Sequence, residues 1–242
     1  MTETSTTLAI ASTATSVGLA LYALKLRAEI AASASGKQTG KTLKRNGDKL
    51  WTAEELIAER RSIFPPDFDG ERLVPREVLN KMLVSANWAP THGKTEPWRF
   101  VVFESPEKRL EVGQLMANWY KNNFPADQFL ESQYERIIYY NTVSSYLIAI
   151  CMKRQKSGKI PEWEEMCSVA CAVQNMHLVA TAHGVGAYWG SSPITMAPEI
   201  TNLLNLGEDD KCLGFFYVGV PKEDAKIPKG VRKPIEDKVT WM

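Results

Sequence analysis

The spacing of apolar residues predicts a series of helices from about residue 52 onward. Thr52 followed by Glu55 is the pattern of a capping box, and it opens a helix that we expect to end near residues 60–62. From Pro75, apolar residues recur at helical spacing and predict a second helix. Gly184 is a fitting stop for the longest predicted helix. The remaining helices are predicted over 106–121, 127–140, 164–183 and 198–206.

Short apolar runs between these helices predict the strands. Residues 146–152 form a continuous apolar run that is short enough for a buried strand. Because helices separate the strands and outnumber them, we predict an α+β domain built around one central sheet. The other predicted strands are 99–103, a strand or turn at 186–189, and 213–220.

The first fifty residues differ in composition from the rest. Residues 8–24 are apolar, small and uncharged, and basic residues follow from Lys25 to Lys49. Extended to residues 6–26, the run just reaches the length of about 20 residues that a membrane-spanning helix needs. The basic flank predicts an anchor with the following domain in the cytoplasm. Two other interpretations stay open: a cleaved peptide that targets the chain to an organelle, and an amphipathic helix lying on a surface.

Residues 33–49 are rich in Gly, Ser, Thr and Lys, which is typical of a flexible linker. Within them, Gly36–Thr42 is similar to a phosphate-binding loop. That interpretation fails because the loop needs four residues between its glycines and only three are present, with no hydrophobic strand before them. We therefore predict a hydrophobic N-terminal segment and basic linker over 1–50, and one folded domain over 51–242.

Composition excludes several classes of function. A formal net charge of +1 argues against a generic nucleic-acid binder. Four cysteines in 242 residues do not make a disulfide framework, so we expect a reducing compartment. Cys167 and Cys171 lie one helical turn apart without a second ligand pair, and we interpret both as small buried residues, with no metal site. Their helix is rich in small residues that let another helix approach closely, so it is a candidate subunit interface.

The stretch Ala89–Phe103 is the most informative for function. A polar loop bracketed by Pro90 and Pro97 runs directly into a strand. Each proline pushes the residue before it toward an extended conformation, so the loop is stiff and presents its N–H groups at fixed positions. A flat cofactor that needs a hydrogen-bond donor and an apolar wall fits such a loop. A purely structural loop fits the same residues.

Three further segments carry basic or backbone-donor groups: residues 60–62, residues 184–193 and residues 229–234. Arginine side chains bind phosphate through paired donors, and Ser62 adds a hydroxyl. Each segment alone is common on protein surfaces. Together with the proline-bracketed loop, and in this order, they resemble the nitroreductase superfamily of FMN-dependent oxidoreductases over about residues 54–240.

Within that superfamily the chain is most similar to the iodotyrosine deiodinase-like branch. The run Ala89–Val102 and the tail segments Val218–Pro221 and Arg232–Ile235 carry this resemblance. It implies an α+β, nitroreductase-like fold with a central mixed sheet flanked by helices, in an intertwined homodimer. Some members of the branch carry an N-terminal membrane anchor, which agrees with a tether through residues 6–26.

The resemblance also implies where the FMN phosphate is bound. Arg60, Arg61 and Ser62 match the motif that holds the phosphate and the ribityl chain. Arg232 matches the C-terminal basic residue that completes the phosphate clamp. The physical logic agrees, because the phosphate carries about two negative charges and several arginine donors offset them.

The flavin ring is implied at a second group of residues. Thr91 matches a position that contacts the flavin, often from the partner subunit. Trp189, Gly190 and Ser191 match the segment whose backbone and hydroxyls face the ring near N5 and O4. Donors at these atoms stabilise the reduced anionic ring and raise its potential.

One departure from the deiodinase pattern concerns the substrate. Deiodinases clamp the amino-acid zwitterion with a Glu, a Tyr and a Lys, but the matching positions here are Tyr120, Phe124 and Ile138. Together with Trp119, the two aromatic residues suggest a lid for a flat, apolar substrate that stacks on the flavin. His92, in the flavin-proximal loop, is a further candidate substrate-binding residue.

From these features we expect an enzyme, an FMN-dependent oxidoreductase in which NADH or NADPH reduces the flavin before an acceptor is reduced, in a ping-pong order. The acceptor would be a nitroaromatic, a quinone or an enone. The cofactor carries the hydride, so no side chain is predicted as a catalytic acid or base. Two hypotheses stay beside this one: a reductive dehalogenase of halogenated phenols, and a flavin-binding module without turnover.

Overall fold

The structure is a computed structural model and describes residues 51–242. The predicted anchor at 6–26 and the linker at 33–49 lie outside the described residues, so the anchor, the targeting alternatives and the domain boundary stay predictions. Among the helices that the structure describes, none combines the length and the apolar character needed to cross a bilayer.

Four strands form one sheet in the order β1-β2-β4-β3. All three pairings are antiparallel, so the prediction of a mixed sheet is wrong for the strands described here. Strands β2 and β3, which helix α6 (Glu162–Ala182) connects, do run in the same direction. However, β4 lies between them, so this crossover creates no parallel pair. The strands are β1 (Trp98–Phe103), β2 (Tyr146–Met152), β3 (Gly186–Gly190) and β4 (Lys211–Gly219).

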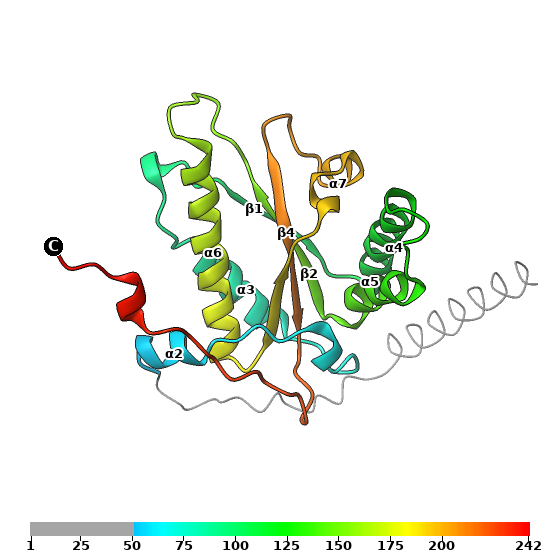
Figure 1. The fold of residues 1–242 in the computed structure, drawn as a ribbon, viewed down its shortest axis with the longest axis horizontal. Coiled ribbons are helices and arrows are strands. Elements are labelled where there is room, and N and C mark those ends of the chain that lie inside the picture. The colour runs from blue at the N-terminus through cyan, green and yellow to red at the C-terminus, as the bar shows by residue number, and fades with distance from the viewer. Residues whose placement is uncertain (1–50) are drawn as a thin grey trace, which may run out of the picture. The chain divides into compact units, whose positions relative to one another are not determined.

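Helices cover both faces of this sheet (Figure 1). Every residue of β2 is buried, as expected for a continuous apolar run. Ile148 and Ile150 pack in one core with α3 and α6, while Leu147 and Ala149 pack in a second core with α4 and the segment around α7. The helices are α3 (Arg76–Ala86), α4 (Pro106–Asn123), α5 (Glu131–Val143), α6 (Glu162–Ala182) and α7 (Pro198–Leu203).

Most predicted helix boundaries are confirmed within a few residues. Helix α2 (Ala53–Glu59) begins with the expected capping box between Thr52 and Glu55, and Arg60 caps its C-terminal end. Helix α5 begins four residues later than expected, because the N–H of Gln128 closes a turn onto the Pro125 carbonyl first. Single 3-10 turns complete the elements: η1 (Pro65–Asp67), η2 (His92–Lys94), η3 (Pro193–Met196) and η4 (Ile235–Lys238).

The prediction that Cys167 and Cys171 are buried is wrong. Both lie on the exposed face of α6, because the helix turns its opposite face, with Val169 and Val173, toward the core. Within residues 51–242 no cluster of three or more His, Cys, Asp or Glu side chains could hold a metal ion.

The segment 60–68 runs along the free edge of β3. The N–H of Ile63 donates to the Ala187 carbonyl at 3.0 Å, and the segment ends at Phe68, whose side chain is fully buried. The Phe68 ring lies so close to β4 that a Cβ atom on Gly219 would approach it to 2.4 Å. Only glycine allows this contact, which holds the segment against the sheet.

Candidate active site

Three arginines from the two ends of the domain lie close together. Arg60 caps α2, Arg61 follows it, and Arg232 lies in the C-terminal tail. Partial burial, and then the positive charges of Arg232 and Arg61, lower the pKa of Arg60. Within residues 51–242 none of the three forms an ion pair with a carboxylate. The cluster is therefore uncompensated positive charge, the environment that a phosphate dianion requires.

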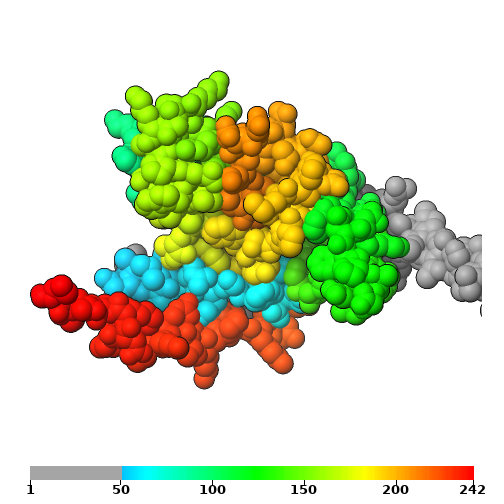
Figure 2. Space-filling model, turned by 45° about the horizontal axis from the view of Figure 1, so that its top comes forward, coloured from blue at the N-terminus to red at the C-terminus, as the bar shows by residue number. Residues whose placement is uncertain are grey.

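Arg61 ties the C-terminal tail to α2. Its Nε donates to the Pro228 carbonyl at 3.0 Å and its Nη1 to the Arg60 carbonyl at 2.8 Å. Its guanidinium also lies against Gly230. Figure 2 shows the tail, in red, lying along the segment that contains α2, in cyan. Through these contacts Arg61 brings Arg232 to Arg60, while its own donors are directed at backbone carbonyls.

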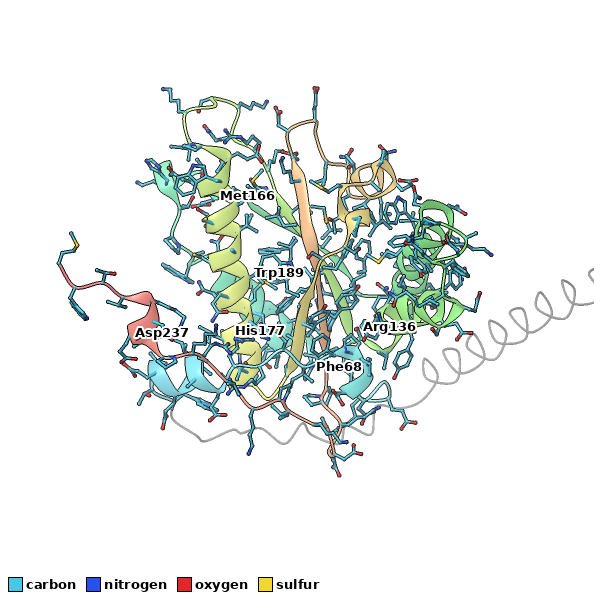
Figure 3. All side chains as sticks on the ribbon, viewed as in Figure 1. Phe68, Arg136, Met166, His177, Trp189 and Asp237 are labelled. Atoms are coloured by element: carbon cyan, nitrogen blue, oxygen red, sulfur yellow. The ribbon has the colours of Figure 1, made fainter. Side chains whose placement is uncertain are left out.

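A buried histidine that the sequence did not assign to the site lies beneath this cluster. The Nε2–H of His177, on α6, donates to the Arg61 carbonyl at 2.9 Å (Figure 3). Burial, and then the charge of Arg60, lower the pKa of His177 to about 4, so the ring is neutral at pH 7. Nothing in the local sequence could have shown this, since the contact joins residues far apart in the chain.

The lowered pKa of His177 makes stability depend on pH. Below pH 6.5 His177 binds a proton in the unfolded chain but stays neutral in the folded chain. The free energy of unfolding should therefore fall as the pH drops. This decrease should end near pH 4, where His177 is protonated in the folded chain as well. By then the free energy of unfolding should have fallen by about 3 kcal/mol. Urea unfolding between pH 4 and 7.5 measures it. His177→Gln keeps a donor toward the carbonyl and should flatten the slope; an equal slope in this variant contradicts the assignment.

An aromatic cavity of about 490 Å³ lies beyond the end of β3, against α4 and α5. Five of the predicted site residues line it together: Trp119, Tyr120, Phe124, Gly190 and Ser191. The Tyr120 and Phe124 rings lie 4.6 Å apart between centroids. The structure thus brings the predicted aromatic lid to the segment predicted to face the flavin ring.

Several residues that line the cavity were not predicted. Tyr188 and Tyr217 are cross-strand partners on β3 and β4, with stacked rings 5.9 Å apart. Burial is the main cause that raises the pKa of Tyr217. Arg136 and Tyr140 come from α5 at a spacing of four residues, so they share one helix face. That spacing was visible in the sequence, but nothing local indicated that the face would meet the sheet at this point.

Trp189 directs its side chain away from the cavity. Successive side chains of a strand point to opposite faces, so Tyr188 faces the cavity and Trp189 joins the core on the other face. Its indole Nε1 donates to the Leu213 carbonyl at 3.1 Å. A Cβ atom on Gly214, where φ is +134°, would lie 2.6 Å from the Gly190 carbonyl, so glycine is required for this close approach. Trp189 can face a flavin only through its backbone.

The edge of β3 connects the arginine cluster to the cavity. Ser62 lies between them, in the segment beside Ala187, and the Phe64 ring then contacts Tyr188 at 4.4 Å between centroids. A ligand with an anionic end and an aromatic end can therefore lie along this edge.

Thr91 and His92 lie far from the arginine cluster in the folded domain. His92 Nδ1 is 2.6 Å from Glu164 Oε2, at the beginning of α6, whereas the arginine cluster lies near His177, toward its other end. At 1.5 Å per residue these contacts are about 20 Å apart along the helix. Figure 1 shows the 89–97 loop and α2 at opposite ends of α6. One chain alone does not bring these two residues to the arginines.

Comparisons with known proteins identify the family and the fold. A model of the nitroreductase family matches residues 57–220. The protein named "Putative NAD(P)H nitroreductase YdjA" from Escherichia coli K12 is 28% identical over 190 residues, covering 75% of this chain and 95% of its own length. Iodotyrosine deiodinase 1 from Sus scrofa is 27% identical over 208 residues, covering 75% of this chain and only 65% of its own length.

Solved structures share the fold. A nitroreductase with bound FMN from Bacteroides fragilis aligns with a TM-score of 0.64 at 22% identity, over 80% of this chain and 100% of that one. A nitroreductase-like family protein from Bacillus cereus aligns with a TM-score of 0.66 at 23% identity, over 80% of this chain and 98% of that one.

Proposed function

The chain belongs to the nitroreductase family, and from that premise we propose that it is an FMN-dependent oxidoreductase that uses NADH or NADPH to reduce a flat aromatic or conjugated acceptor. One observation carries the proposal: the edge of β3 connects an uncompensated arginine cluster to an aromatic cavity. The bacterial relative named as an NAD(P)H nitroreductase supports the reductant, and the FMN-bound structure with the same fold supports the cofactor.

The residues present fit FMN. Arg60 and Arg232 would bind the phosphate, since no carboxylate among the described residues pairs with either of them. Ser62 would lie beside the ribityl chain, and Gly190 and Ser191 would meet the ring at the mouth of the cavity. When bound, FMN supplies the hydride transfer. The chain's own side chains would bind and orient the cofactor and the substrate and would exclude water. No side chain is therefore assigned as an acid or a base.

The size of the cavity supports the proposed ping-pong order. At about 490 Å³ it is within the usual size range of small-molecule sites, so we expect the nicotinamide and the acceptor to occupy it in turn. Aromatic side chains on α4 and β4 provide faces for stacking, which favours nitroaromatics, quinones and enones as acceptors.

Membership of the deiodinase-like branch stays a hypothesis, because the bacterial nitroreductase and the deiodinase are almost equally identical to this chain. This likeness keeps reductive dehalogenation of halogenated phenols as a second candidate function. Tyr120, Phe124 and Ile138, in place of the zwitterion clamp, argue against iodotyrosine itself.

We also propose that the active form is a homodimer. Thr91 and His92 can reach a flavin held by the arginine cluster only from a second copy, given the separation of about 20 Å along α6 within one chain. The exposed face of α6 suits such an interface because it carries no charge. It contains Trp163, Cys167, Ala170, Cys171 and Gln174.

The purified full-length chain tests these proposals. It should be yellow, retain FMN, oxidise NADH or NADPH with a nitroarene, a quinone or an enone, and sediment at twice its mass of 27.1 kDa. Initial rates should give parallel double-reciprocal lines. Release of halide from a halogenated phenol, with little reduction of a nitroarene, would favour the dehalogenase instead. Colourless protein that takes up no FMN overturns the proposal, and flavin without turnover indicates a binding module.

A further inference from the structure

Arg136 is the only charged residue among those that line the aromatic cavity in the part of the chain that the structure describes. The rest of the lining is aromatic, apolar or uncharged polar, and no carboxylate is included. An apolar cavity with one cation and no counter-charge is built for a ligand that brings the missing negative charge.

The guanidinium of Arg136 has contacts that position it, but no carboxylate among the described residues pairs with it. It donates to the Gln133 side-chain carbonyl and lies 5.9 Å from the centroid of the Tyr140 ring. Glu131 and Glu135 lie on the same helix, yet no ion pair involves Arg136 among residues 51–242. Figure 3 shows Arg136 on α5, on the α4–α5 side of the sheet. The side chain is exposed at the rim, so it is accessible to a ligand.

We propose that Arg136 makes the cavity selective for aromatic acceptors that carry a carboxylate. The planar guanidinium matches a carboxylate through two parallel N–H···O bonds, and the surrounding rings stack on an aromatic body. As a statement about acceptors, this rests on the function proposed above. As a statement about binding, it rests only on the composition of the cavity.

The reductant is a second source of negative charge, because NADH and NADPH carry phosphates. If Arg136 served the nucleotide, its loss would raise the KM for NADH or NADPH. If it serves the acceptor, its loss would act on the carboxylate alone. The two assignments therefore give different results in the same variant.

Ligand binding tests the site without turnover. Benzoate and benzamide have nearly the same shape and differ in charge, so their dissociation constants at pH 7.5 measure the contribution of the carboxylate. We expect the purified protein to prefer benzoate, and Arg136→Gln to weaken benzoate binding about tenfold while benzamide is unchanged. Arg136→Lys should lose part of the preference. Arg76→Gln, which removes an exposed charge outside the cavity lining, should lose none.

Turnover tests the acceptor. One NAD(P)H and one proton convert the nitro group of 4-nitrobenzoate to a nitroso group and water, a two-electron reduction, and 4-nitrobenzamide reacts in the same way. In Arg136→Gln the ratio of kcat/KM for the acid to that for the amide should fall about tenfold, through KM. Added salt should reduce the preference of the unchanged protein.

Three results would overturn the proposal: an unchanged preference in Arg136→Gln, an equal loss for benzoate and benzamide, or a raised KM for the nucleotide with the preference intact. Failure of the proposed function looks different. A protein that oxidises NADH or NADPH with no nitroarene, quinone or enone contradicts the oxidoreductase, while a benzoate preference that Arg136→Gln removes still supports the anion site.

Discussion

Replacing Arg60 and Arg232 together by glutamine is expected to weaken FMN binding well beyond either replacement alone, each of which should weaken it about tenfold or more. A hydrogen bond to a charged group contributes about 1.5–3 kcal/mol, and the exposed position of Arg232 favours the lower end. Partial burial is the main cause of the lowered pKa of Arg60, and repulsion from Arg232 and Arg61 adds to it; a bound phosphate would replace that repulsion with attraction. Quenching of FMN fluorescence on titration with the flavin-free protein gives the dissociation constants.

The two single losses should not add independently, because both arginines would contact one phosphate. The matched control is Arg76→Gln. Arg76 is an exposed arginine that pairs with Glu104 elsewhere on the domain, so this variant should bind FMN normally. A double variant with unchanged affinity would show that the phosphate binds somewhere else.

Arg61 should act by a different route. Arg61→Ala is expected to weaken FMN binding as well, but by releasing the tail that carries Arg232, since its donors hold the Pro228 and Arg60 carbonyls. Proteolysis near residues 228–232 should accelerate in Arg61→Ala and stay slow in Arg60→Gln. Equal protection of the tail in both variants would argue that Arg61 contacts the phosphate directly.

Replacing Phe68 by alanine is expected to lower the free energy of unfolding by about 3–5 kcal/mol. The ring has no exposed surface, and Gly186 and Gly219 leave room for it against β3 and β4. Removing it leaves a cavity that cannot collapse, because the sheet beneath it is held by the backbone pairing of β3 with β4. Urea unfolding followed by circular dichroism measures the loss.

Phe68→Leu fills part of the same space and should cost about half as much. Since Phe68 ends the segment that begins at Arg60, the alanine variant should also bind FMN more weakly than the leucine variant. A midpoint of urea unfolding equal to that of the unchanged protein would show that the 60–68 segment is not fixed by this contact.

Local sequence was enough to predict most of the elements. The capping box at Thr52 and Glu55, the buried strand over 146–152 and the stop at Gly184 all depend on residues within one or two turns of each other, and all are present. Resemblance between short motifs likewise indicated residues of the arginine cluster and of the aromatic cavity. It compares short segments and needs no knowledge of how they pack.

Patterns within short stretches of the chain therefore predict the helices, the strands and the residue types available for binding. The tertiary structure alone decided three things: that β4 separates β2 from β3, that Tyr188 and Arg136 share a cavity while Trp189 faces the opposite core, and that Arg61 carries the tail to Arg60. Backbone preferences act between neighbours in the chain. Strand order, the sidedness of a strand in its sheet and the docking of a tail depend on contacts between residues far apart, whose partners no local pattern specifies.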